Sequence, residues 1–295
     1  MLKLCSLSCD RGATIAELLI ASMVGLVLVS LTHSVILANH RLYQVDIVRT
    51  ELNQNLRSAL DILAANARET GERLPATFPA LLVTDGGATP DEMVIRRNLL
   101  DEVLVVCQDL TSGSSNSWVM LSDPLAGNPA CTYPSQSTSY NSWSTYRTDE
   151  GGIVDAYIVN LANGEGEFFK YDSEQDFGGD LMIHRDSGNW QHDYPAEFSA
   201  IYILEEWDVS VVGDFLQLVV NQDSDNPRNI VYGIEDFQVQ VAMQDTTVMD
   251  GFAISDDWVD IQSIDLTLSG QTTYKGQDIS ASLTSKFFPR NILSN

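Results

Sequence analysis

The residues that most often carry enzyme chemistry are few and scattered in this chain of 295 residues. The four histidines are His33, His40, His184 and His192, and no two of them have the spacing of metal ligands. The sequence lacks the G-x-S-x-G nucleophile motif, the Walker phosphate loop, the H-E-x-x-H zinc motif and the G-x-G-x-x-G nucleotide motif. We therefore expect no catalytic residues, no cofactor and no metal, and we expect His184 and His192 in a turn.

Acidic side chains are a second class of candidate ligands, because calcium binds oxygen atoms. Alternating acids occupy residues 172–180, and another oxygen-rich cluster occupies residues 223–226. A calcium-binding EF-hand loop needs Gly at its sixth position and Glu at its twelfth. The first segment has Phe177 and Ile183 there. Because the chain contains 41 Asp and Glu residues, chance clustering explains both segments better than a calcium site.

One carboxylate stands where an ordinary membrane anchor has no use for it. Glu17 lies at the start of an apolar run, residues 18–38, that is long enough to span a bilayer. A short polar and basic segment ending in Gly12 precedes it. A charged side chain inside a bilayer costs about 2.5–3.5 kcal/mol on insertion scales, so a carboxylate in this position indicates a function.

Gly12, Ala13 and Glu17, with the apolar run behind them, resemble the processing site of type IV prepilins and pseudopilins. In that family a membrane-embedded prepilin peptidase cuts after the glycine, and the new N-terminal residue is usually N-methylated. The resemblance implies a leader over residues 1–12, cleavage between Gly12 and Ala13, and methylation of Ala13, although the commonest residue there in the family is Phe. It also implies that Glu17 pairs with the terminal amine of a neighbouring subunit during assembly, since opposite charges attract strongly in a low-dielectric helix bundle.

The charged residues predict how the chain is oriented in the membrane and which partners it repels. Lys3 and Arg11 precede the apolar run, which favours a cytoplasmic N-terminus and a periplasmic remainder. The formal net charge of −25 repels nucleic-acid phosphates and anionic lipid, so we expect no nucleic-acid binding by this subunit alone.

The cysteines agree with this placement. Cys5 and Cys9 lie in the leader and would leave with it, whereas Cys107 and Cys131 would remain. Because these two cysteines would remain together in an oxidising compartment, we predict a Cys107–Cys131 disulfide.

Residues 13–71 read as one continuous helix. No proline occurs between Ala13 and Leu74, and Gly71 is suited to cap the C-terminus. We expect residues 13–39 to form a transmembrane and assembly segment and residues 40–71 an amphipathic segment, in all about 90 Å long. Apolar residues in the second segment recur every three or four positions, which predicts one face against a sheet. They are Val45, Val48, Leu52, Leu56, Leu60, Leu63 and Ala67.

The remainder, residues 72–295, reads as a β-rich globular domain. Strict alternation over 237–243, at 264–268 and at 279–287 predicts half-buried antiparallel strands. The Ser-, Asn- and Thr-rich region 108–152 is irregular, and we expect residues 135–145, with Tyr140 and Trp143, to form a surface loop. Other expected strands cover 93–96, 103–106, 118–121, 153–161, 168–171, 181–184, 201–212 and 216–220.

Two further segments extend the resemblance. Residues 52–64, followed by Arg68 and Gly71, look like the second half of the N-terminal helix of PilW-type minor pilins and of J-type minor pseudopilins of type II secretion. The C-terminal order of aromatic and apolar residues from Gly233 to Phe287 is similar to the same minor pilins. The resemblance implies an α+β, type IV pilin-like fold, with the long helix packed on a C-terminal antiparallel sheet.

We therefore expect a minor pilin subunit that primes or caps a type IV pilus. The implied partners are prepilin peptidase, other minor and major pilins, the inner-membrane assembly platform, and membrane lipid before assembly. The implied location is the inner membrane, in a single pass, and then the pilus or its tip. The alternatives are a minor pseudopilin of a type II secretion system and, in another class, a signal-anchored periplasmic binding or adhesin-like protein that does not need Glu17.

Overall fold

A computed structural model describes residues 14–76, 78–123, 125 and 128–292. The chain divides into two compact units, which are described separately. One comprises the chain up to Glu51 together with Thr273–Ile279, and the other comprises Leu52–Thr272 and the chain from Ser280 onward. The leader over residues 1–12, with its two cysteines, and the cleavage residues Gly12 and Ala13 lie outside the described residues.

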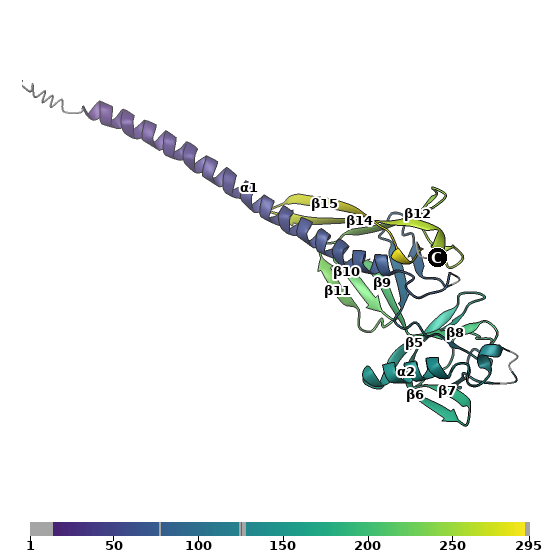
Figure 1. The fold of residues 1–295 in the computed structure, drawn as a ribbon. Helices are drawn as coiled ribbons and strands as arrows, with labels where there is room; N and C mark the ends of the chain where they lie inside the picture. The colour runs from purple at the N-terminus through teal and green to yellow at the C-terminus, as the bar shows by residue number, and fades with distance from the viewer. Residues whose placement is uncertain (1–13, 77, 124, 126–127, 293–295) are drawn as a thin grey trace, which may run out of the picture. The chain divides into compact units, whose positions relative to one another are not determined.

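The first element is α1, Ile15–Glu69, a single helix of 55 residues (Figure 1). The predicted helix over 13–71 is confirmed as a helix, with bounds two residues shorter at each end. Gly71 follows it at a φ of +76°, a left-handed conformation that glycine adopts without strain. Its N–H donates to the carbonyl of Arg96 at 2.9 Å, so the chain leaves the helix directly into a contact with the neighbouring strand.

Within the described residues the strands form three β-sheets with antiparallel pairing. The five-stranded sheet has the order β1 (Leu81–Thr84), β2 (Glu92–Asn98), β9 (Leu204–Val212), β10 (Phe215–Val220) and β11 (Arg228–Tyr232). The four-stranded sheet has the order β13 (Val248–Met249), β12 (Asp236–Met243), β14 (Ile261–Tyr274) and β15 (Gln277–Phe287). The six-stranded sheet has the order β3 (Leu104–Val105), β8 (Ser199–Tyr202), β5 (Val154–Asn160), β6 (Gly166–Phe177), β7 (Asp180–Arg185) and β4 (Trp118–Met120). Short 3-10 turns occupy Pro129–Cys131, Trp258–Asp260 and Arg290–Ile292.

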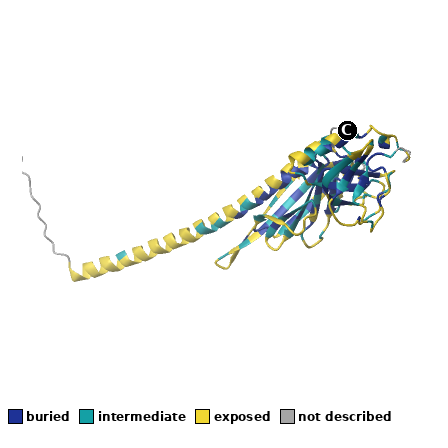
Figure 2. Ribbon diagram, turned by 90° about the horizontal axis from the view of Figure 1, so that it is seen from below, coloured by how far each residue is buried: buried dark blue, intermediate teal, exposed yellow. Residues whose placement is uncertain are grey.

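The larger core surrounds the last part of α1. From Leu52 onward the helix buries one side, visible as dark blue on the ribbon in Figure 2, and that side packs on the five- and four-stranded sheets. The predicted alternation is confirmed on β12 and β14, where Val239 lies opposite Leu266 and both are buried. The predicted apolar face of the helix is confirmed from Leu52 to Ala67. A helix and a sheet that each have one apolar face bury these faces against each other.

A second core lies on the six-stranded sheet. Both faces of β5 are buried: Tyr157 and Val159 belong to the core around α1, whereas Ala156 and Ile158 belong to the second core. Side chains alternate between the faces of a strand, so this sheet separates two apolar layers.

Helix α2, Ser137–Asp149, covers the second core beside β6 and β7 (Figure 1). The predicted surface loop over 135–145 is therefore wrong. Tyr140 and Trp143 are buried at helical spacing, and the indole N–H of Trp143 donates to the carbonyl of Glu102 at 2.9 Å. Burial of these rings outweighs the weak helix propensity of the Ser and Thr residues between them.

A buried ion pair joins β2 and β9 within the five-stranded sheet, and its guanidinium also contacts Tyr157 on β5 of the six-stranded sheet. Arg96 Nε donates to Glu206 at 2.6 Å, its Nη1 donates to the carbonyl of Pro79 at 3.0 Å, and its guanidinium lies 5.5 Å from the ring centre of Tyr157. Arg96 and Glu206 are 6% and 2% exposed, so loss of either partner would leave the other charge buried and unpaired.

Candidate functional site

The start of α1 holds the one candidate assembly residue that the structure describes. The carboxylate of Glu17 accepts hydrogen bonds from the backbone N–H of Thr14 at 2.9 Å and from its hydroxyl at 3.1 Å. In return, the N–H of Glu17 donates to the Thr14 hydroxyl oxygen at 3.3 Å. This reciprocal pair is a capping box, which satisfies backbone groups that the first helical turn leaves without partners.

The capping box gives Glu17 a role within the single chain that our sequence analysis missed. The Thr-x-x-Glu spacing from Thr14 to Glu17 is the signal that would have predicted it. Both oxygens belong to a side chain on the surface, and an ionised carboxylate offers about four acceptor positions. Two bonds to Thr14 therefore leave Glu17 able to accept a further donor, such as an amine.

Behind this cap, α1 is long and apolar enough to cross a membrane, and it is the one such helix among the described residues. Its apolar side chains are exposed, including Leu18 at 67% and Leu26 at 70%. The hydroxyl groups of Ser22 and Ser34 donate to carbonyls one turn back, each at 2.8 Å. A hydroxyl bonded within its own helix needs no water, which suits a low-dielectric environment.

The structure contains the disulfide expected between Cys107 and Cys131, whose Cα atoms are 5.6 Å apart. Both cysteines are buried. The amide of Gln136 organises this region: its Nε2 donates to the carbonyls of Val105 and Leu121, and its Oε1 accepts from the N–H of Val105. The disulfide and this amide together join β3, the end of β4 and the start of α2.

The acidic segment 172–180 is part of a network of side-chain contacts. Asp172 lies 2.6 Å from Nδ1 of His184, which is in β7, in agreement with the strand expected over 181–184 and not with a turn. Glu174 accepts two hydrogen bonds from Arg147 at 2.8 Å and one from Tyr171 at 2.8 Å. Burial raises the pKa of Glu174, but these hydrogen bonds outweigh burial and lower the pKa below its usual value.

No cluster in the described part of the chain brings three or more His, Cys, Asp or Glu side chains together in a way that would hold a metal ion. In the second candidate segment, the Asn226 amide donates to both carboxylate oxygens of Asp223, at 3.0 and 3.1 Å.

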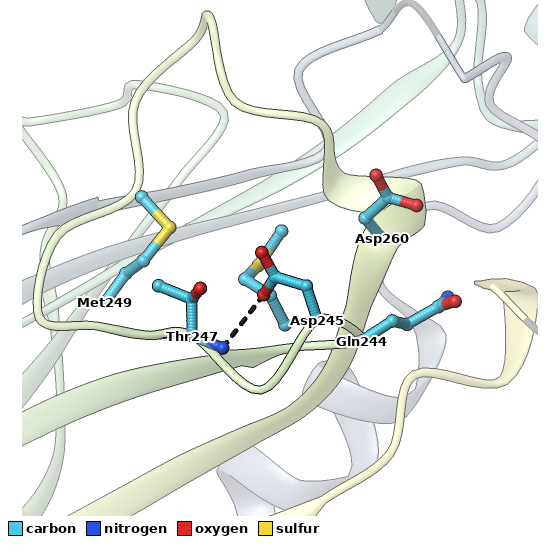
Figure 3. A pocket seen from close by; sticks show the side chains of 6 residues that line it. Gln244, Asp245, Thr247, Met249 and Asp260 are labelled. Carbon is cyan, nitrogen blue, oxygen red and sulfur yellow. Dashed lines mark hydrogen bonds between the residues drawn. The ribbon is translucent and has the colours of Figure 1, made fainter.

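A hollow of about 310 Å³ lies beside the turn between β12 and β13, and Figure 3 shows the side chains that line it. The Asp245 carboxylate accepts from the N–H of Thr247 at 2.9 Å, the dashed line in the figure, and this bond accounts for the lowered pKa of Asp245. The thioether side chains of Met243 and Met249 and the carboxylate of Asp260 complete the walls with Gln244.

A second hollow, of about 420 Å³, lies between the six-stranded sheet and the turn after β10. Unlike the first, it has both charged and aromatic walls. Its lining residues are Asp155, Phe168, Phe169, Lys170, Arg185, Ser187, Asn221, Gln222 and Asp223.

These features define an α+β protein with an apolar N-terminal helix of membrane-spanning length and a disulfide-bonded, β-rich unit. In comparisons with known proteins, no protein-family model, no curated protein and no solved structure matches the chain.

Proposed function

We propose that this chain is a minor pilin subunit that is cleaved by prepilin peptidase between Gly12 and Ala13 and takes part in assembly of a type IV pilus, in its priming or tip complex. Before assembly the subunit resides in the inner membrane, with its N-terminus cytoplasmic and its β-rich unit periplasmic. The new N-terminal Ala13 is methylated, and the fold is of the type IV pilin kind.

One observation carries the proposal. The prepilin-like residues Gly12, Ala13 and Glu17 stand directly ahead of a helix that continues without a break from an exposed apolar segment into the core of the β-rich unit. A protein that is only anchored to the membrane would not need one continuous helix, because a flexible linker could equally well connect its membrane segment to its globular unit. A pilin-like subunit needs the apolar segment both in the membrane and in the assembled fibre.

The exposed face of α1 supports assembly through helix packing. Outside the apolar run, Tyr43 and Ile47 are 63% and 42% exposed. They lie seven and eleven positions after Ile36, on the same side of the helix, so they extend an apolar stripe beyond residue 38. A stripe that continues past the bilayer-length run fits contact with the helices of other minor and major pilins at the assembly platform.

The first test is the intact mass and N-terminal sequence of the protein purified from membranes of strains with and without prepilin peptidase. The expected result is a chain that starts at Ala13 only when the peptidase is present. A chain that keeps residues 1–12 in both strains would refute the proposal and favour a signal-anchored binding protein.

The second test separates the two roles of Glu17. Glu17→Gln keeps a side chain that can close the capping box but removes the charge, whereas Thr14→Val keeps the charge and removes the capping hydroxyl. We expect Glu17→Gln to be cleaved normally but excluded from the fibre, and Thr14→Val to assemble. Assembly is measured by crosslinking to other pilins and by recovery of the subunit in sheared pili. The opposite pattern would show that Glu17 acts through the cap and not through a neighbouring amine.

The phenotype of a deletion strain distinguishes a type IV pilus from a type II secretion system. Loss of piliation or twitching in a deletion strain is the expected result for a minor pilin. Loss of exoprotein secretion with normal pili would instead identify a minor pseudopilin of type II secretion.

A further inference from the structure

The hollow between the six-stranded sheet and the turn after β10 has the properties of a binding pocket. Its volume of about 420 Å³ lies in the range of small-molecule sites. Three of its walls come from separate parts of the chain: Asp155 on β5, Lys170 on β6, and the turn at Asn221.

Arg185, at the end of β7, forms a wall with an incomplete set of hydrogen bonds. The residue is 6% exposed, and its guanidinium lies 4.2 Å from the ring centre of Trp190. Its Nε donates to the carbonyl of Ser187 at 2.8 Å, and its Nη2 donates to the carbonyl of Asn189 at 3.1 Å and lies 3.6 Å from Glu167. Its Nη1 is buried and has no hydrogen-bond partner among the described residues. A buried donor of a charged group without an acceptor is costly, so a shift of the guanidinium toward the pocket, where a ligand can offer Nη1 an acceptor, would be favourable.

The opposite wall is held in a strained conformation. Asn221 and Gln222 have φ values of +51° and +60°, in the left-handed region, which Asn tolerates but Gln rarely adopts. The side chain of Asn221 holds the turn in place, because its Oδ1 accepts from the N–H of Glu206 at 2.9 Å and its Nδ2 donates to Asp155 at 3.3 Å. Strained positions that the surrounding structure maintains are frequent at binding sites.

The charges of the lining side chains balance. Lys170 and Arg185 are cationic, and Asp155 and Asp223 are anionic. Lys170 Nζ already lies 2.5 Å from Asp155. An anionic ligand would meet these two carboxylates within a chain of net charge −25, and a cationic ligand would meet Arg185. A neutral ligand rich in hydrogen-bonding groups avoids both penalties.

We propose that this pocket binds one unit of a neutral saccharide. Sugar hydroxyl groups both donate and accept, so one ligand can supply an acceptor for Arg185 and donors for the carboxylate of Asp223. The half-buried ring of Phe168 provides an apolar wall for the C–H face of the sugar, since the face of an aromatic ring carries negative potential. The inference concerns the β-rich unit alone and does not depend on cleavage or pilus assembly.

The test uses the full chain in a detergent without a sugar headgroup. Saturation-transfer NMR and titration calorimetry are run with methyl glucoside, methyl galactoside, methyl mannoside and N-acetylglucosamine, and with glucuronate and glycine as charged and zwitterionic comparisons. We expect saturable binding of at least one neutral sugar and at least tenfold weaker binding of glucuronate. Tighter binding of glucuronate or glycine, or no saturable binding of any neutral sugar, would overturn the proposal.

Three variants locate the binding. Lys170→Ala removes an exposed lysine from the rim, and Gln222→Gly removes a rim side chain while relieving the positive φ, so both are expected to fold. Each should weaken sugar binding about tenfold, the effect of losing a hydrogen bond that involves a charged or buried group. Lys286→Ala is the matched control, because Lys286 is a similarly exposed, ion-paired lysine on β15, away from the pocket. Equal affinities in all three variants would place the sugar elsewhere and refute this pocket.

Discussion

The junction between α1 and the sheet depends on a single glycine. Gly71 has a φ of +76°, and a Cβ atom placed on it would lie closer than 3.0 Å to three ring carbons of Trp258. Trp258 is 2% exposed and cannot swing into solvent. Gly71→Ala should therefore destabilise the protein in two ways, through the left-handed backbone and through overpacking.

The structure separates these two contributions. A left-handed alanine costs about 1–2 kcal/mol, and forced overpacking in a core costs about 1–3 kcal/mol. Gly113 provides the matched control, since its φ is +77° and no atom lies within 4 Å of its hypothetical Cβ. Gly113→Ala should show only the backbone effect, so the difference between the two variants is about 1–3 kcal/mol.

The assay is thermal unfolding of the detergent-solubilised full chain, followed by tryptophan fluorescence. With an unfolding entropy of about 2.1 cal/mol/K per residue, that difference corresponds to a melting temperature about 2–5 °C lower for Gly71→Ala than for Gly113→Ala. A smaller side chain at position 258 should remove it: in a Trp258→Phe background, the two alanine variants should have nearly equal effects. Equal melting temperatures in the native background would refute the close-packing argument, because Trp258 would then have yielded without cost.

Two other groups give separate predictions. Burial, followed by the charges of Glu92 and Glu206, raises the pKa of Asp208 to about 6, so the folded state binds this proton more tightly than the unfolded state and stability falls as pH rises from about 4 to 6. Asp208→Asn should therefore stabilise the protein at pH 7.5 by on the order of 1 kcal/mol after solvent screening, and thermal melts at pH 4.5 should show the advantage lost. Replacing Cys107 and Cys131 together by Ala should lower the free energy of unfolding by about 3 kcal/mol and should make urea unfolding insensitive to reductant; an unchanged transition midpoint would contradict it.

Much of the fold follows from short-range pattern. The alternation of Phe237, Val239 and Val241 has the period of a strand, and these residues are buried on one face of β12. The recurrence of Leu52, Leu56 and Leu63 has the period of a helix, and α1 buries that face. Such periods are set by backbone geometry and survive in most tertiary contexts, so they predict the element and its buried side together.

Helix α2 shows where this reasoning fails. Its sequence is dominated by Ser and Thr, which favour turns, and its hydrophobic face consists of little more than Tyr140 and Trp143. Their spacing of three was a helical signal, but a weak one over so short a segment. The decisive interactions come from outside the segment, from the sheet beneath Trp143 and from the Gln136 amide bound to two other strands.

The sites divide in the same way. Glu17 and the cysteine pair are conspicuous in the sequence because of their local context, whereas the pocket around Arg185 joins residues 155 to 223 through the fold alone. Glu17 itself combines both kinds of information. Its position before an apolar run predicts a hydrogen-bonding partner in another subunit. Its spacing of three from Thr14 makes Thr14 a partner within the same helix. The two roles are compatible, since the cap fixes the carboxylate at the helix start and leaves acceptor positions open. A capped Glu17 would meet an incoming amine already oriented, so a weaker cap in Thr14→Val should slow assembly without preventing it.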